Sequence, residues 1–134
     1  MRCLPLALVL LATPAYAATP ISGRWLTQDG SAIVTVAPCG SATCGRITRV
    51  LKGPATGQAV DRNNPDPKLR TRPVEGLTIL SGFTDGGDDW RGRIYDPNSG
   101  KTYKSIVKRE ADGRLKVQGC IAFLCRTQRW TAAR

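Results

Sequence analysis

Residues 89–121, DWRGRIYDPNSGKTYKSIVKREADGRLKVQGCI, decide the fold because apolar and polar residues alternate along them in stretches separated by short turns. In the first stretch Trp90, Gly92 and Ile94 fall on one face, and polar side chains fall on the other. A period of two residues is typical of a strand with one buried face. The last stretch repeats the pattern on one face with Leu115, Val117, Gly119 and Ile121.

The connection after the first stretch has the sequence DPNSG, residues 96–100. Pro97 fixes φ at the start of such a turn, and Gly100 supplies the positive φ that closes it. We therefore predict a hairpin at this point.

The whole chain predicts an all-β fold with eight strands. Most connections are short and contain Gly, Asp, Asn or Ser, which is typical of neighbouring antiparallel strands. Eight strands in such a meander close most simply into an antiparallel up-and-down barrel, whereas a two-sheet sandwich is the alternative because turns do not reveal closure. The expected strands are residues 22–27, 31–37, 45–51, 77–83, 89–95, 102–109, 114–121 and 126–132.

One connection, residues 52–76, is much longer than the others and rich in proline. A loop of this length in a compact domain is usually functional or flexible. Residues 66–70 predict one helical turn, with Asp66 as its cap and Pro67 at its first position. Three polar side chains are expected either to hold the loop against the barrel as a lid or plug, or to contact a ligand: Asp61, Asn64 and Arg70.

Residues 1–17 have the pattern of a secretion signal, with Arg2 followed by an apolar run and the small-residue motif AYA. We predict cleavage after Ala17. The apolar run is shorter than the roughly 20 residues that a membrane-spanning helix needs. Residues 18–134 are therefore expected to form a single soluble domain in the periplasm or outside the cell.

The predicted mature chain is strongly basic, because loss of Arg2 reduces the formal charge only from +10 to +9. Its charges are scattered singly along the expected strands and are not gathered beside a platform of aromatic residues. This distribution favours a solvated basic surface facing the anionic groups of a cell envelope and argues against nucleic-acid binding.

Four cysteines in two matched couples, Cys39 with Cys44 and Cys120 with Cys125, remain after the predicted cleavage. An even number of cysteines in an oxidising compartment favours disulfides. We predict bridges within each couple, because four intervening residues allow their ends to meet. Zinc thiolates are the alternative, but they require reduced sulfur and commonly use a shorter spacing.

Catalytic machinery is hard to assemble from these residues. The chain contains no histidine, which removes the usual base of a serine or cysteine nucleophile and the commonest metal ligand. Asp88 and Asp89 are adjacent, so on a strand they would point to opposite faces. We therefore expect a protein without enzymatic activity, cofactor or metal site.

Gly23-Arg24-Trp25 near the start, with Arg126 or Arg129 beside Trp130 near the end, resembles the closing device of lipocalin-type barrels. In those barrels a tryptophan of the first strand packs under an arginine from the end of the chain. One departure is that Ala132-Ala133 stands where a further arginine is expected.

A longer series of short motifs resembles, in the same order, the bacterial secreted family DUF2147. The resemblance implies a lipocalin-like barrel in a bacterial envelope and implies no established activity. Its motifs are Cys44-Gly45-Arg46-Ile47, Asp61, Asn64-Pro65, Arg70, Gly76-Leu77, Tyr95-Asp96-Pro97, Gly100-Lys101, Tyr103, Gly119-Cys120, Cys125-Arg126-Thr127-Gln128 and Trp130-Thr131.

Two classes of function follow from these observations. In the first, the barrel binds a small apolar or amphipathic molecule in its lumen, since eight strands leave room for core side chains or one small ligand. In the second, the basic surface and residues 52–76 contact an anionic envelope component or a protein. An unfilled lumen would distinguish the first class, and its inward candidates are Trp25, Ile33, Ile79, Trp90, Ile94, Tyr103, Val117 and Ile121.

Overall fold

The computed structural model describes residues 7–12 and 16–134. The predicted signal segment, residues 1–17, therefore lies partly outside the described residues, and its described part contains no helix or strand. Within residues 7–12 and 16–134, no helix is both long enough and apolar enough to cross a membrane. Cleavage after Ala17 stays a prediction.

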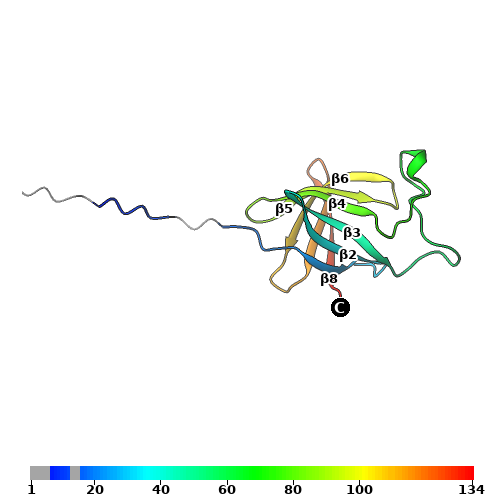
Figure 1. Ribbon diagram of the computed structural model, residues 1–134, viewed down its shortest axis with the longest axis horizontal. Coiled ribbons are helices and arrows are strands. Elements are labelled where there is room, and N and C mark those ends of the chain that lie inside the picture. Colours follow the sequence, from blue (N-terminus) through cyan, green and yellow to red (C-terminus); the bar gives the residue numbers. More distant parts are fainter. Residues whose placement is uncertain (1–6, 13–15) are drawn as a thin grey trace, which may run out of the picture.

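Eight strands form a closed antiparallel barrel in which each strand pairs with the next and β1 pairs with β8 (Figure 1). The all-β up-and-down barrel predicted from the sequence is confirmed, and the sandwich is excluded. The largest change in a strand boundary is in β3, which begins at residue 42 and not at residue 45. The strands are β1 Gly23–Leu26, β2 Ala32–Cys39, β3 Ala42–Val50, β4 Thr78–Asp85, β5 Trp90–Asp96, β6 Lys101–Arg109, β7 Leu115–Ile121 and β8 Leu124–Ala132.

The core runs along the inside of the barrel, and most of its largest side chains lie toward the end at which β1 begins. Its largest fully buried side chains include Trp25 of β1 and Trp130 of β8, which are almost inaccessible to solvent. Leu115 and Val117 of β7 and Val107 of β6 pack in the same cluster. Burial of each such side chain contributes about 1.5–3 kcal/mol, so this end of the barrel is its main source of stability.

Trp25 is covered by Arg109 of β6, whose guanidinium carbon lies 5.2 Å from the centre of the indole ring. The expectation that Arg126 or Arg129 covers this tryptophan is therefore wrong. Arg126 lies near the start of β8, whereas β1 pairs only with the end of that strand. Arg129 instead pairs with Glu110 at 2.8 Å.

Two glycines on the inner wall let large side chains of β4 enter the barrel. A Cβ atom at Gly92 would lie 2.7 Å from the ring of Phe83, and one at Gly45 would lie 2.8 Å from Leu80. Both Phe83 and Leu80 are almost fully buried. The glycines are therefore needed for close approach, and the space that a ligand would need at these levels is occupied by side chains.

The seam between β1 and β8 is short, because β1 has four residues and β8 has nine. The ladder pairs Trp25 with Ala132 and Leu26 with Thr131, and next to it the backbone N–H of Ala133 donates to the Arg24 oxygen at 2.9 Å. Nearer the start of β8, the backbone N–H of Arg129 donates to a side-chain oxygen of Gln28 at 2.8 Å. The first part of β8 therefore extends beyond the partner strand that closes the barrel.

Candidate functional site

The long loop, residues 52–76, is held to the barrel by a cluster of buried polar groups around Asp61. The Tyr95 hydroxyl of β5 donates to Asp61 Oδ1 at 2.6 Å, and Asn64 Nδ2 donates to Oδ2 at 2.8 Å. Arg72 Nε donates to the same Oδ2 at 3.0 Å. Asp61 is inaccessible to solvent, so these donors replace the water that its carboxylate would otherwise bind.

The cluster changes the protonation behaviour of two of its members. Burial tends to raise the pKa of Asp61, but hydrogen bonds from Tyr95, Asn64 and Arg72 outweigh it and hold the pKa of the carboxyl below its usual value. Burial and the neighbouring Asp61 carboxylate raise the pKa of Tyr95 to about 12. At neutral pH the Asp61 carboxyl is therefore ionised, and the Tyr95 hydroxyl is neutral.

Arg70 makes a different contact from the one expected, since its Nε donates at 2.8 Å to the backbone oxygen of Asn64 inside the loop. The predicted helical turn is present as the 3-10 helix Pro67–Leu69, capped by Asp66. The side chains of Asp61, Asn64 and Arg70 thus organise the loop itself. In Figure 1 the loop lies at the end of the barrel away from the N-terminal extension.

Most of the eight lumen candidates are core residues. Trp25, Ile79 and Val117 belong to the buried cluster, while Trp90 and Ile94 are partly buried against it. Tyr103 is half-buried.

The two other candidates are not part of the buried core cluster. Ile33 is buried, but it alternates with the inward residues Ala32 and Val34 and is absent from the core cluster. Ile121 is 66% exposed at the β7–β8 turn, where β8 has passed beyond β1. The expected lumen position of Ile33 is wrong because the predicted face of β2 was shifted by one residue. The expected lumen position of Ile121 is wrong because the end of β7 extends beyond the part of the barrel that β1 closes.

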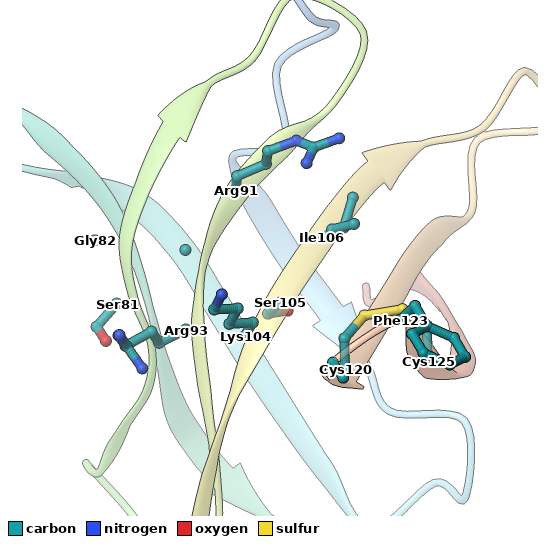
Figure 2. A pocket seen from close by; sticks show the side chains of 12 residues that line it. Ser81, Gly82, Arg91, Arg93, Lys104, Ser105, Ile106, Cys120, Phe123 and Cys125 are labelled. Carbon is teal, nitrogen blue, oxygen red and sulfur yellow. A yellow bond between two sulfur atoms is a disulfide. The ribbon is translucent and has the colours of Figure 1, made fainter.

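A groove of about 610 Å³ lies on the outer face of the barrel across β4, β5, β6 and the β7–β8 turn (Figure 2). We call it the outer groove. Its side chains combine positive charge with apolar surface and include Arg91, Arg93, Lys104, Ile106, Cys120 and Phe123. Its volume is within the roughly 300–1,000 Å³ typical of small-molecule sites.

Two cations lie directly opposite one another in the outer groove, because Arg93 of β5 pairs with Lys104 of β6 in the ladder. The same row continues to Ser81 on one side and to Cys120 on the other. Like charges at opposed positions destabilise a sheet. Among the described residues, neither Arg93 nor Lys104 forms an ion pair, whereas Arg91 pairs with Asp89 at 3.0 Å. An anion bound between Arg93 and Lys104 would relieve this repulsion.

Sequence reasoning missed the outer groove, although one signal for it was available. The hairpin at residues 96–100 fixes the register of β5 and β6, and that register places Arg93 opposite Lys104. No local pattern predicted that Phe123 lines the outer groove, because its position depends on how far the β7–β8 turn extends.

Both predicted disulfides are present, Cys39 with Cys44 and Cys120 with Cys125. The first joins the paired ends of β2 and β3, and the second lies at the start of the β7–β8 turn. In Figure 2 the second disulfide lies beside Phe123 at the edge of the outer groove.

A family model described as "Uncharacterized protein conserved in bacteria (DUF2147)" matches residues 23–132. The chain belongs to this family. The match begins with β1 and ends with β8, so the eight-stranded barrel is the unit that this DUF2147 protein shares with its family. No curated protein matches it.

The fold of this DUF2147 protein is similar to that of a solved structure, "Protein HP1028 from the human pathogen Helicobacter pylori belongs to the lipocalin family". The two chains are 21% identical, the alignment covers 87% of this chain and 85% of the other, and the TM-score is 0.75. At this identity the likeness establishes a lipocalin-like fold for the DUF2147 barrel.

Proposed function

We propose that this protein binds a small amphipathic anion, without catalysing its conversion, in the outer groove and not in the lumen. The observation that carries the proposal is the opposed pair Arg93 and Lys104 in a groove that Ile106 and Phe123 also line. A carboxylate or phosphate head would bind between the two cations. A short apolar chain would lie along the apolar side chains.

Two further findings support this proposal. The lipocalin-like fold is compatible with small-ligand binding, and the core side chains that fill one end of the barrel favour a site elsewhere. The two disulfides are compatible with work in an oxidising compartment outside the cytoplasm. A role for the loop of residues 52–76 in contacting a partner finds less support, because Asp61, Asn64 and Arg70 bind groups within the protein.

Calorimetric titration with decyl phosphate, below its micelle concentration, tests the proposal. We expect saturable binding that weakens at high salt, and no binding of decyltrimethylammonium. Arg93→Ser and Lys104→Ser should each raise Kd about tenfold or more, because a hydrogen bond to a charged group contributes about 1.5–3 kcal/mol. The same substitutions should stabilise the free protein by about 0.2–1 kcal/mol, since each removes a like-charge pair.

Lys108→Ser is the matched control, because Lys108 of β6 also lies opposite a cation, Lys116 of β7, but does not line the outer groove. It should stabilise the free protein without changing the affinity for decyl phosphate. Absence of saturable binding, or an equal loss of affinity in Lys108→Ser, would refute the proposed site.

A further inference from the structure

Four consecutive apolar residues, Ile121, Ala122, Phe123 and Leu124, form the β7–β8 turn and the strand ends that flank it, and we call them the apolar tip. Ile121 is 66% exposed, Phe123 90% and Leu124 70%. In Figure 1 this orange-red turn projects beyond the strands of the barrel. Single exposed apolar side chains are ordinary, but a contiguous group at a projecting position marks an interaction site.

The backbone of the apolar tip is unfavourable for the residues that occupy it. Ile121 pairs with Leu124, so two residues form the turn, and Ala122 has a φ of 53°. Of the two turn residues only Ala122 has a positive φ, and glycine is the usual residue at the first position of such a turn. The chain instead has Ala-Phe and joins the flanking strands through the Cys120–Cys125 disulfide. Side chains that are kept against the preference of the turn are expected to have a role of their own.

The charged residues nearest the apolar tip in the sequence are all basic. From residue 113 to its end the chain contains lysine and arginine but no aspartate or glutamate. Arg126 lies two residues after the tip, and Lys104 of β6 pairs with Cys120 just before it. Apolar residues flanked by cations bind anionic membranes, because the side chains enter the interface while the cations contact lipid phosphates.

We infer that the apolar tip inserts into the headgroup region of an anionic phospholipid bilayer, with Arg126 and Lys104 against the lipid phosphates. The apolar tip shares Phe123 with the outer groove, and Lys104 also lines that groove, whereas Ile121 and Leu124 lie outside it. A substitution at Leu124 therefore tests membrane binding separately from ligand binding in the groove.

Sedimentation with vesicles tests the inference, using phosphatidylglycerol mixed with phosphatidylcholine, and phosphatidylcholine alone. The protein should bind the mixed vesicles, release from them at high salt, and bind phosphatidylcholine at least about tenfold more weakly. The double variant Ala122→Gly/Phe123→Ser should lose about tenfold or more of this affinity, because it removes Phe123, the most exposed side chain of the apolar tip. It should melt at the same or a higher temperature than the parent, since glycine suits the positive φ at position 122.

Leu124→Asp gives an independent variant, and Leu69→Asp is its control because Leu69 is also exposed but lies in the long loop. Leu124→Asp should lose binding and Leu69→Asp should keep it. Phe123→Trp adds a depth readout, because its emission should shift to shorter wavelength on mixed vesicles and be quenched by brominated lipid.

Several outcomes would overturn the inference. These are no binding to mixed vesicles, equal binding by Ala122→Gly/Phe123→Ser, or an unshifted tryptophan emission in Phe123→Trp. Concentration-dependent dimers that are abolished by Leu124→Asp, without vesicle binding, would assign the apolar tip to a second copy of the chain.

Discussion

Replacing Asp61 by alanine tests whether the buried polar cluster holds the long loop. The substitution removes the acceptor of three donors, the hydroxyl of Tyr95, Nδ2 of Asn64 and Nε of Arg72. The Arg72 side chain is 38% exposed, so water can solvate it after the change. The other two donors are less accessible, but Asn64 Nδ2 already lies 3.4 Å from the Tyr95 hydroxyl and can donate to it.

The expected loss of stability is therefore smaller than for a fully buried ion pair. An unsatisfied buried donor costs about 1–3 kcal/mol, and removing one partner of a buried pair costs about 3–5 kcal/mol. With one donor solvated and one re-paired, we expect about 2–4 kcal/mol. At about 4 °C per kcal/mol for a domain of this size, the Tm should fall by roughly 8–16 °C.

Differential scanning calorimetry at pH 7 measures this change, with limited trypsin digestion as a local readout at Arg62, Lys68 and Arg70 of the loop. Asp61→Asn should lose less stability than Asp61→Ala, because its amide can donate to Tyr95 while its oxygen still accepts. Asp112→Ala removes an exposed ion pair with Arg114 and should leave the Tm almost unchanged. A Tm of Asp61→Ala within about 2 °C of the parent, with no faster cleavage of the loop, would refute the reasoning.

Three further predictions concern the same fold. Gly100→Ala should destabilise the protein more than Gly113→Ala in urea unfolding, because both glycines have positive φ but only a Cβ at Gly100 would collide with the Asn63 carbonyl oxygen; equal losses would contradict this contact. Non-reducing peptide mapping should recover the two local disulfides, and a crosslink between the two couples would contradict the pairing. The raised pKa of Tyr95 means that its neutral form stabilises the fold fully below pH 10.0, and this stabilisation should disappear as pH rises towards about 12. Tyr95→Phe should remove that part of the alkaline loss of stability, and an unchanged pH profile would contradict the assignment.

Local patterns were sufficient to predict the strands and their order, because each hairpin is determined by its own turn. Gly100 illustrates this, since its φ of 70° agrees with the hairpin predicted from DPNSG. The cysteine couples were predictable for the same reason, because each bridge closes over a short segment.

Apart from the one-residue shift of the predicted face at Ile33, the failures depend on how the barrel closes. Arg109 covers Trp25 because the ends of β6 and β1 meet, and no local pattern records that contact. Ile121 alternates correctly with Gly119, yet it is exposed because β1 ends too early to cover it. The outer groove has a similar origin, since its cations follow from a local register but its shape depends on the neighbouring turn.

The short seam between β1 and β8 is the place at which we expect the barrel to open locally most often. Two residue pairs close it, whereas every other pair of neighbouring strands has a longer or more extensively contacted ladder. Local opening requires least free energy where the fewest contacts break. We therefore expect amide hydrogen exchange at Leu26 and Thr131 to be faster than in β6 and β7. The Cys120–Cys125 disulfide joins β7 to β8, so the β7–β8 hairpin would then move as one unit. Trp25 would stay in place beneath Arg109.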